Sequence, residues 1–498
     1  MRIGIDLGTT NCAVAYINEN GLPEIIPNKE GNRTTPSVIL YEDGTFIVGE
    51  VAKDDSVDNS DNIVQFVKRQ IGNPVYKNSF GGKEYTPEEL SAIILKRLKE
   101  DAENYLGNPV TEAVITVPAY FDDAQRKATI DAGAIAGLNV LKIINEPTAA
   151  ALAYASNDSK PQKILVYDLG GGTFDVTLMS YSNEEIRVIA TEGNRALGGF
   201  DFDNAIITYI SDKFEQLYNI DLEDDDEAYQ DLRLKAEQAK KTLTSRGKTT
   251  ITISSEGNKL KEEITQELFK DMTSNLIERT YLIIDDVLKE AGVQSSDVDK
   301  ILLIGGSTRM PAVEEMIIEK FGVEPSKDIN PDEAVAIGAA IQGSLIDDTA
   351  SVADTSYNKT VVDVNSHGLG IVANNDEGIS SNTILIPRNT EIPAKVKETF
   401  YTVEDNQDSV NLRITEGDST DLEEVKIIGE SIMTLNPRPA NSPIDIVISY
   451  DKDAIIQVEA FDGVDQSKLK NVVIERKSNL TQADVDTMKN ELSSISVE

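Results

Sequence analysis

Two short stretches of the chain carry similar residues, Asp6-Leu7-Gly8-Thr9-Thr10 and Asp168-Leu169-Gly170-Gly171-Gly172-Thr173, each between two apolar runs that read as strands. A tight Gly/Thr turn between strands leaves backbone N–H groups pointing into one concavity, where they can surround phosphate oxygens. The aspartate beside each turn repels phosphate unless a hard cation such as Mg²⁺ lies between them. Two such loops facing each other would hold a nucleoside triphosphate from both sides. The repeat therefore predicts ATP bound between two lobes.

One such loop alone would fit a plain hairpin with a glycine turn equally well. The second copy favours phosphate binding, because similar apolar runs, Ile3-Gly4-Ile5 and Ile164-Leu165-Val166, precede the two loops. The second loop is also followed by a strand-like run, Phe174-Asp175-Val176-Thr177-Leu178. The pattern is thus strand, loop, strand in a duplicated form.

A predicted helix over residues 228–245 carries polar side chains on one face. Its apolar residues form one stripe, whereas Glu237, Lys240, Lys241 and Thr244 share a different face at helical spacing. The simpler interpretation of that face is a solvated surface with an ordinary ion pair.

Residues in two further segments of the sequence could contact a bound nucleotide. The turn Gly305-Gly306-Ser307 follows an apolar strand and lets the backbone approach a planar ligand closely, while Arg309 just beyond it could stack on an adenine. Taken alone, this Gly-Gly is a turn and nothing more. Lys68-Arg69 places two cations in a strongly acidic chain. A surface pair is the default interpretation of these two residues, and a lysine that faces phosphate is the sharper one.

The secondary-structure elements that must position these residues are typical of an α/β protein. Strand-like and helix-like segments alternate up to about Leu345. The clearest helices cover residues 87–105 and 122–136, besides 228–245. Residues 113–118 form a nearly continuous apolar run, which is typical of a buried strand.

The composition and the periodicity of the sequence then change. Residues 347–359 are rich in Asp, Ser, Thr and Ala without periodicity, which indicates a linker. Beyond them, segments such as Val410-Asn411-Leu412-Arg413-Ile414 alternate apolar and polar residues between Asp, Asn and Gly turns. That alternation predicts an antiparallel all-β domain. One short helix is expected at the end, starting near Thr481.

The length and composition of the chain limit its possible domain organisation and partners. A chain of 498 residues is too long for one core, so we expect two or three domains. The net charge of −39 argues against a nucleic-acid partner or an anionic membrane, since neither polyanion would gain from meeting it. Met1-Arg2 leads directly into a strand, and no apolar stretch approaches the roughly 20 residues of a membrane span. We therefore expect a cytoplasmic protein.

The single cysteine and the single histidine carry no catalytic prediction. Cys12 cannot form an internal disulfide, in keeping with a reducing compartment, and is expected to pack as a small residue. His367 has no second histidine or thiol cluster with which to bind zinc, and we expect it in a loop.

The motifs resemble the DnaK-type heat-shock chaperone family. The three stretches with this resemblance are residues 5–11, 166–175 and 303–311. Residues 114–126, 143–154 and 330–340 support it. The match is dense up to Leu345 and thinner afterwards.

The resemblance implies an actin-like, two-lobed ATPase followed by a β-sandwich that binds extended apolar peptide. It divides the chain into an ATPase domain at 1–346, a linker at 347–362, the sandwich at 363–477, and a short C-terminal helix at 478–498 that is a remnant of a lid. The implied cofactors are ATP/ADP and Mg²⁺, with K⁺ left open as a further cation.

Site residues are carried over by motif. Hydrated magnesium would be held by Asp6, Glu146 and Asp168. Hydrolysis would involve Lys68, which orients the attacking water and the γ-phosphate, together with Glu146, Asp168 and Thr173. The phosphates would contact Gly8, Thr9, Thr10, Asn11, Gly170, Gly171, Gly172 and Thr173. Adenosine would be enclosed by Glu237, Lys240, Lys241, Thr244, Gly305, Gly306, Ser307, Arg309 and Asp332. Nucleotide state would pass towards the linker through Pro118 and Arg126.

These assignments imply a chaperone that binds extended apolar segments of unfolded proteins and couples ATP hydrolysis to peptide affinity. The implied partners are such clients, a J-domain co-chaperone and a nucleotide-exchange factor. An alternative is an ATP-hydrolysing relative that serves one dedicated partner or another chaperone. A sugar or acetate kinase on the same actin-like fold is a third interpretation, but it would have no evident use for the β-domain.

The sequence departs from the family pattern in several places. The family's linker is strongly apolar, whereas residues 359–363 are less so, and we expect looser docking of this segment. The substrate arch is matched by Asn374 and Val403, with Val410 at the central pocket, so asparagine replaces an apolar residue. Lys142 stands where contacts with J-domain proteins usually involve arginine. The family's long helical lid has no counterpart in the printed sequence, from which we expect rapid peptide release.

Overall fold

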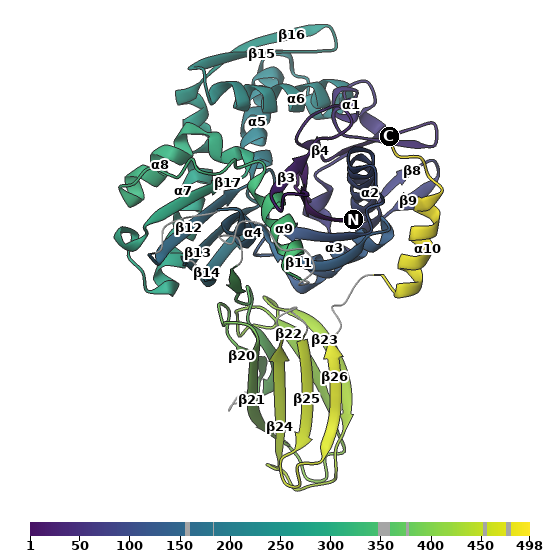
Figure 1. The fold of residues 1–498 in the computed structure, drawn as a ribbon, viewed down its shortest axis with the longest axis vertical. Helices are drawn as coiled ribbons and strands as arrows, with labels where there is room; N and C mark the ends of the chain where they lie inside the picture. Colours follow the sequence, from purple (N-terminus) through teal and green to yellow (C-terminus); the bar gives the residue numbers. More distant parts are fainter. Residues whose placement is uncertain (155–159, 183, 347–358, 375–377, 452–455, 475–479) are drawn as a thin grey trace.

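The structure is a computed structural model, and an α/β body and a β-domain are its two main parts (Figure 1). Within the part of the chain described here, no helix combines the length and the apolar character that crossing a membrane requires. The described residues are 1–154, 160–182, 184–346, 359–374, 378–451, 456–474 and 480–498.

Lobe I of the body is built on a sheet in which β1 pairs in parallel with β10 and antiparallel with β2. Helices α2 and α3 pack beside this sheet, and both begin with a capping box that satisfies their first backbone N–H groups. The sheet order is β11 (Asn139–Asn145), β10 (Glu112–Val117), β1 (Arg2–Asp6), β2 (Asn11–Ile17) and β3 (Pro23–Ile26). The remaining elements are β4 (Thr35–Pro36), β5 (Val38–Glu42), β6 (Thr45–Val48), α1 (Glu50–Asp54), β7 (Ile63–Gln65), β8 (Asn78–Phe80), β9 (Lys83–Tyr85), α2 (Pro87–Leu106) and α3 (Asp123–Ile135).

Lobe II repeats this arrangement, since β12 pairs in parallel with β17 and antiparallel with β13. The duplicated strand, loop, strand pattern of the sequence is therefore a duplicated sheet, and the predicted α/β fold is confirmed. The sheet order is β17 (Lys300–Ile304), β12 (Gln162–Leu169), β13 (Phe174–Tyr181), β14 (Glu185–Asn194) and β18 (Thr360–Val362). The other elements are α5 (Gly199–Tyr218), α6 (Asp226–Leu243), β15 (Lys248–Ser255), β16 (Asn258–Thr265), α7 (Gln266–Ala291) and α8 (Pro311–Phe321).

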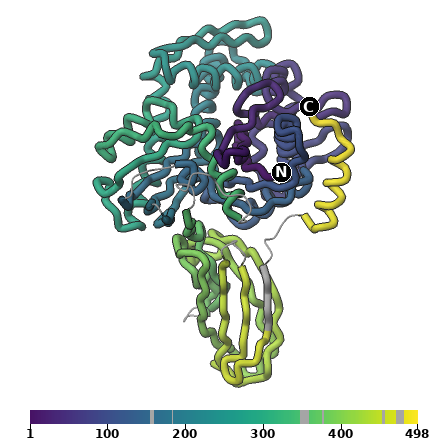
Figure 2. The backbone as a smooth tube through the Cα atoms, viewed as in Figure 1, coloured from purple at the N-terminus to yellow at the C-terminus, as the bar shows by residue number. Residues whose placement is uncertain are grey.

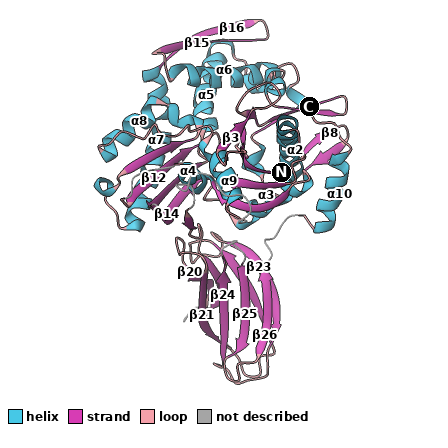
Figure 3. Cartoon of the chain, viewed as in Figure 1, coloured by secondary structure: helices cyan, strands magenta, loops and turns pink. Residues whose placement is uncertain are grey.

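Two helices of small apolar residues, α4 (Glu146–Ala153) and α9 (Ala334–Ser344), lie between the two sheets (Figure 3). Both are apolar all round, as buried helices are. Close approach requires glycine here: a Cβ on Gly338 would lie 1.8 Å from the carbonyl oxygen of Ala149 in α4. The two lobes thus meet along tightly packed helix backbones.

The β-domain consists of two four-stranded antiparallel sheets that share one hydrophobic cluster. Ile371 and Ile414 enter the cluster from one sheet and Ile446 and Ile448 from the other. Residues of each strand alternate between this core and solvent, as the period-two pattern predicted. The first sheet is β20 (Ser380–Ile386), β19 (Leu369–Asn374), β22 (Ser409–Glu416) and β23 (Lys426–Thr434). The second is β21 (Ala394–Tyr401), β24 (Pro443–Tyr450), β25 (Ile456–Asp462) and β26 (Lys468–Ile474).

The end of the predicted linker is docked on lobe II. Strand β18 pairs in parallel with the edge strand β14, and the Lys359 ammonium donates a 2.6 Å hydrogen bond to the carbonyl of Ser182. Residues 360–362 are thus paired with lobe II through their backbone, and the expectation that this docking is looser than in the family stays a prediction. The rest of the linker, residues 347–358, lies outside the described residues.

Helix α10 (Gln482–Ser493) begins after its capping residue Thr481, where the sequence predicted a helix to start. It lies against lobe I, away from the β-domain (Figure 2). Val485 and Leu492 are buried in the lobe I core, and so is Val497 beyond the helix. Val497 also forms a parallel bridge with Phe46 of β6, so the segment after α10 adds to the edge of a lobe I sheet.

Candidate functional site

A cavity of about 470 Å³ opens between the two lobes. It receives residues from β1, the loop after it, α4, the loop after β12, α6 and the turn after β17. All of the predicted site residues line this cavity except Gly172, which lies just behind it beside Thr9. The structure therefore gathers into one place residues that the sequence spreads from Asp6 to Asp332.

The two phosphate loops pack face to face. A Cβ on Gly171 would lie 2.3 Å from Cγ2 of Thr10, and a Cβ on Gly172 would lie 2.5 Å from Cγ2 of Thr9. Any side chain larger than hydrogen would push the two loops apart. Glycine is thus needed where the second loop crosses the threonines of the first.

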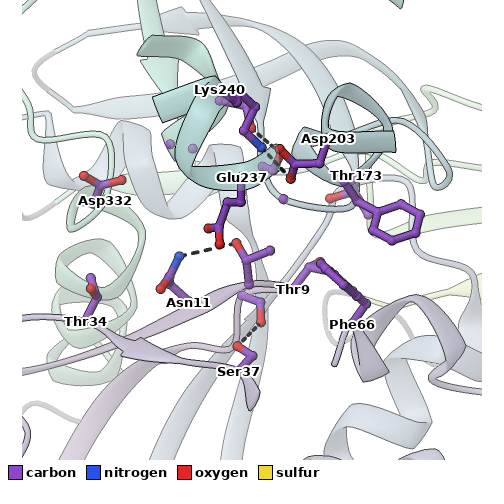
Figure 4. Close-up of a pocket in the computed structure, with 18 of the residues that line it drawn as sticks. Thr9, Asn11, Thr34, Ser37, Phe66, Thr173, Asp203, Glu237, Lys240 and Asp332 are labelled. Carbon is purple, nitrogen blue, oxygen red and sulfur yellow. Dashed lines mark hydrogen bonds and ion pairs between the residues drawn. The ribbon is translucent and has the colours of Figure 1, made fainter. Parts of the chain in front are cut away.

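Lys68 and Glu146 form an ion pair at the floor of the cavity, with 2.5 Å between Nζ and Oε1. Both are almost buried, at 6% and 9% side-chain exposure. Lys68 lies in a short 3₁₀ turn that follows Phe66, which has a left-handed backbone (φ 60°) and also lines the cavity (Figure 4). Glu146 is the first residue of α4. Burial alone would lower the pKa of Lys68, but the charges of Glu146 and Asp6 raise it, so the ammonium is fully charged.

Asp6 and Asp168 lie with Glu146 at the same end of the cavity. Burial and the charge of Glu146 raise the pKa of Asp6 to about 7 and raise the pKa of Asp168 as well. Three carboxyl groups, of which Glu146 and Asp168 are buried, lie beside Lys68, and a bound cation would offset their negative charge.

The donor set fits a hydrated ion better than a directly coordinated one. Among the described residues, no group of three His, Cys, Asp or Glu side chains is close enough together to hold a metal directly. Magnesium keeps several of its waters and accepts carboxylate oxygens. Asp6, Glu146 and Asp168 therefore fit a hydrated Mg²⁺.

The polar face of α6 also lines the cavity, and its residues share one face as the helical spacing predicted. Lys240 donates hydrogen bonds to the carbonyl of Gly199 at 2.9 Å and to Asp203 at 2.8 Å (Figure 4). Glu237 pairs with Lys241 of the same helix at 2.7 Å and with Lys53 of lobe I at 2.6 Å. This face of α6 is thus an ordered wall rather than a freely solvated surface.

The turn after β17 closes the end of the cavity. Gly305 has a φ of 82°, and a Cβ there would lie 2.4 Å from the carbonyl oxygen of Leu169. Ser307 donates a 3.0 Å hydrogen bond to the carbonyl of Gly170, so the turn is tied to the second phosphate loop. Arg309 pairs with Asp332 at 2.5 Å, which holds the guanidinium at the mouth.

Several lining residues were missed by the sequence analysis, among them Lys53, Phe66 and Asp203. Asp203 had a usable signal, because it follows a Gly-Gly pair at the start of a helix. Lys53 had none, since its partner Glu237 lies far away in the sequence. Cys12 is buried, and burial raises the pKa of its thiol to about 12, in agreement with a packing role.

The residues assigned to the peptide arch lie at the end of the β-domain remote from the lobes. Val403 is 68% exposed, whereas Val410 at the start of β22 is half-buried against the domain core. The amide oxygen of Asn374 accepts a 2.9 Å hydrogen bond from Ser380. The side chain of Asn374 thus has a polar partner within the β-domain.

Pro118 and Arg126 flank the segment where lobe I meets the β-domain. Arg126 donates a 2.8 Å hydrogen bond to Asn145, and Asn145 donates one of 3.0 Å to Asp363, the residue that follows the linker. Lys142 also lies on β11, three residues before Asn145.

Comparison with known proteins agrees with this architecture. The family model described as "Hsp70 protein" matches residues 2–498. The Chaperone protein DnaK of Halobacterium salinarum is 43% identical over 495 residues, which cover 98% of this chain and 77% of that relative. The Chaperone protein DnaK of Thermotoga neapolitana is 44% identical over 497 residues, which cover 98% of this chain and 82% of that relative. The resemblance read from the three motifs is confirmed over nearly the whole length, and the chain belongs to the Hsp70 family.

Proposed function

We propose that this chain is an ATP-hydrolysing molecular chaperone that binds extended apolar segments of unfolded polypeptides. The observation that carries the proposal is the meeting of two duplicated phosphate loops around the buried Lys68–Glu146 pair, in a cavity lined by both lobes. The chaperone names of the relatives support the second half of the proposal.

The phosphates lie against the two loops, where backbone N–H groups and the hydroxyls of Thr9, Thr10 and Thr173 can donate to their oxygens. Lys68 then exchanges its bond with Glu146 for one with the γ-phosphate and the attacking water. Glu146, freed from the lysine, orients that water. A cation at this position stabilises the charge that develops on the phosphoryl oxygens in the transition state.

The metal site would be formed by Asp6, Glu146 and Asp168 acting through bound waters. A hydrated Mg²⁺ held there would supply positive charge that offsets the carboxylates and the phosphates. K⁺ as a further cation rests on the family resemblance alone. The adenosine would lie between the polar face of α6 and the turn after β17, with Arg309 at its edge.

The β-domain would hold a client at its remote end, with Val403 and Asn374 on either side and Val410 beneath. A J-domain co-chaperone and a nucleotide-exchange factor are proposed as partners because members of the family use them. A cytoplasmic location is proposed from the reducing compartment that a single buried cysteine fits.

The test is turnover of ATP by the full chain, with and without Mg²⁺ and with short apolar peptides of unrelated sequence. Hydrolysis that needs Mg²⁺ and rises with several of these peptides is the expected result. Hydrolysis that none of the peptides accelerates would favour one dedicated partner instead. Turnover that requires a small-molecule acceptor would replace the proposal with a kinase.

A further inference from the structure

The turn that carries Lys68 contacts lobe II through the residues on either side of the lysine. The ring of Phe66 meets the ring of Phe200 edge-on, with 4.6 Å between the ring centroids. The guanidinium carbon of Arg69 lies 4.7 Å from the centroid of the same Phe200 ring. Phe66 and Arg69 belong to the turn after β7 in lobe I, whereas Phe200 lies in the first turn of α5 in lobe II. One aromatic side chain of lobe II thus contacts the Lys68 turn twice.

Arg69 makes two further contacts with lobe II. It pairs with Asp201 of α5 at 3.5 Å, and the two side chains are only 15% and 21% exposed. A Cβ on Gly172 would lie 3.0 Å from Cγ of Arg69, so the aliphatic part of the arginine packs on the second phosphate loop. Arg69 therefore ties the Lys68 turn both to this loop and to the start of α5.

Phe200 is held in place within lobe II. Its backbone N–H donates a 2.8 Å hydrogen bond to the carbonyl of Gly171, and the N–H of Gly199 donates one of 2.9 Å to the carbonyl of Gly170. On α6, the guanidinium carbon of Arg233 lies 5.8 Å from the centroid of the Phe200 ring. The position of the ring is therefore set relative to the second phosphate loop.

Core packing does not account for these contacts. Phe66, Arg69 and Phe200 are partly exposed, and neither ring is a member of the hydrophobic clusters that the described residues of the two lobes form. Both rings line the nucleotide cavity instead. Two rings that meet edge-on, and a guanidinium over a ring, attract each other beyond the burial of apolar area. The three side chains thus join the two lobes at the cavity itself.

From this geometry we propose that Phe200 is a positioning residue for ATP hydrolysis, which sets the place of Lys68 relative to the second phosphate loop. This inference rests on the proposed function, in which the phosphates lie against the two loops and Lys68 acts on the γ-phosphate. Lys68 comes from lobe I and the second loop from lobe II, so the geometry of the reaction depends on what joins them. Phe200 joins them through Phe66 and Arg69.

Loss of the Phe200 ring should therefore slow the chemical step more than it weakens nucleotide binding. The residues assigned to adenosine and to the phosphates do not include Phe200, so they remain available to the nucleotide. Lys68 also remains, but the turn that carries it loses its two contacts with the ring. Misplacement of a reacting group by about 1 Å can slow a reaction about 10²-fold.

The experiment compares Phe200→Leu with Phe200→Tyr in the full chain. Leucine keeps an apolar side chain but removes the ring, whereas tyrosine keeps the ring. Single-turnover hydrolysis of ATP with Mg²⁺ is measured for each variant, and nucleotide affinity is measured separately with a fluorescent nucleotide. We expect Phe200→Leu to slow hydrolysis about tenfold or more with nucleotide affinity close to wild type, and Phe200→Tyr to hydrolyse ATP at close to the wild-type rate. The matched control is Tyr105→Leu, which removes a ring pair with Tyr16 inside lobe I, where neither tyrosine lines the cavity.

A second measurement shows whether Phe200 acts through Lys68. Phe200→Leu is combined with Lys68→Ala, and hydrolysis should then be no slower than in Lys68→Ala alone, because the group to be positioned is gone. A further loss of about tenfold in the double variant would mean that the ring affects hydrolysis independently of Lys68, and would overturn the inference.

Three other results would also overturn the inference. The first is hydrolysis at the wild-type rate in Phe200→Leu. The second is loss of nucleotide binding in Phe200→Leu, which would make the ring part of the binding site itself. The third is an equal slowing in Tyr105→Leu, which would mean that any loosening of lobe I lowers the rate. Absence of hydrolysis in wild type would instead count against the proposed function.

Discussion

Lys53 of lobe I and Glu237 of lobe II meet at 2.6 Å across the mouth of the nucleotide cavity. Each side chain is 21% exposed, so the pair is partly shielded from solvent. Lys53 comes from the short helix α1 and Glu237 from the polar face of α6, and both line the cavity. The pair is thus a clasp between the lobes that must open when the cleft widens.

The clasp predicts the rate of nucleotide release. Glu237→Gln removes a charge-assisted hydrogen bond that contributes about 1.5 kcal/mol, so release should be about tenfold faster. Stopped-flow displacement of a fluorescent nucleotide measures it directly. Glu315→Gln is the control, since its pair with Lys270 is exposed on the outer surface of lobe II. Equal release rates in wild type and Glu237→Gln would mean that the clasp does not restrain the cleft.

The same clasp predicts a dependence of stability on pH. Burial alone would raise the pKa of Glu237, but Lys53 and Lys241 lower it from 4.5 to about 2. A carboxyl with a lowered pKa stabilises the folded state above its ordinary pKa and ceases to do so as the pH falls towards the lowered one. The advantage in Tm of wild type over Glu237→Gln should therefore be complete above pH 4.5 and shrink between pH 4.5 and 2. Calorimetric scans of both proteins across this range test it, and an advantage that grows on acidification contradicts the assignment.

Lys68 is predicted to be essential for hydrolysis and dispensable for binding. Its ammonium is the cation that the structure places beside Glu146 at the cavity floor, and loss of one such group usually slows the chemical step by about 10²–10³. Lys68→Ala should therefore slow single-turnover hydrolysis at least about a hundredfold while nucleotide still binds. Lys77→Ala, which removes an exposed lysine paired with Glu84, is the control. Hydrolysis at the wild-type rate in Lys68→Ala would remove Lys68 from the mechanism.

The sequence predicted the parts of the site that local chemistry determines. The Asp-Leu-Gly loops need glycine and threonine at fixed places in a turn, so Thr10 and Gly171 could be recognised without knowing that they touch. The face of α6 that carries Lys240 follows from helical spacing alone. These residues line the cavity as the motifs predicted, although their roles stay predictions.

Features set by distant contacts could not be predicted in this way. In the sequence, Lys53 cannot be distinguished from other surface lysines, because its partner Glu237 on α6 is far away along the chain. His367 lies in a loop, as expected, but its contact with Tyr120 depends on how the β-domain docks against lobe I. Looser docking of the linker was expected because Thr360 and Asp363 make residues 359–363 less apolar. The structure pairs residues 360–362 with β14 through backbone hydrogen bonds, which cannot be predicted from side-chain composition.

Val410 is predicted to be the floor of the peptide site. It is half-buried at the start of β22, so a larger ring there would fill the space that a client side chain enters. Val410→Phe should abolish binding of a short leucine-rich peptide in fluorescence anisotropy. The control is Ile427→Phe, a similar enlargement on β23 near the opposite end of the same sheet. Unchanged binding in Val410→Phe would show that this chain does not use that cleft.

The Asn374→Met variant refines the same test. Methionine adds apolar contact worth about 1 kcal/mol, but it also removes the hydrogen bond from Ser380 that orders this end of β19. The improvement in the free energy of peptide binding is therefore expected to be smaller than the apolar contribution alone. Ser380→Ala separates the two contributions, because it removes the hydrogen bond and leaves the asparagine in place.

The segment after α10 should be held to lobe I by its buried side chains. Phe46 and Val48 of β6 donate their backbone N–H groups to Ser496 at 3.1 Å and Glu498 at 2.7 Å, and Lys96 donates to the carbonyls of Leu492 and Ile495 near the end of α10. The two N–H groups of β6 are protected from exchange only while this segment stays in place.

Leu492→Ala should therefore speed hydrogen exchange at Phe46 and Val48. Removal of a buried leucine side chain costs about 2–5 kcal/mol, so exchange through release of the segment should rise more than about tenfold at these two amides. Amides of the central strand β10, which do not contact the segment, should change little. Lys489→Ala, on the exposed side of α10, is the matched control and should leave all of these rates as in wild type. If Leu492→Ala left Phe46 and Val48 as protected as before, the buried face of α10 would not be what keeps β6 paired, and protection would have to come from the strand contacts alone.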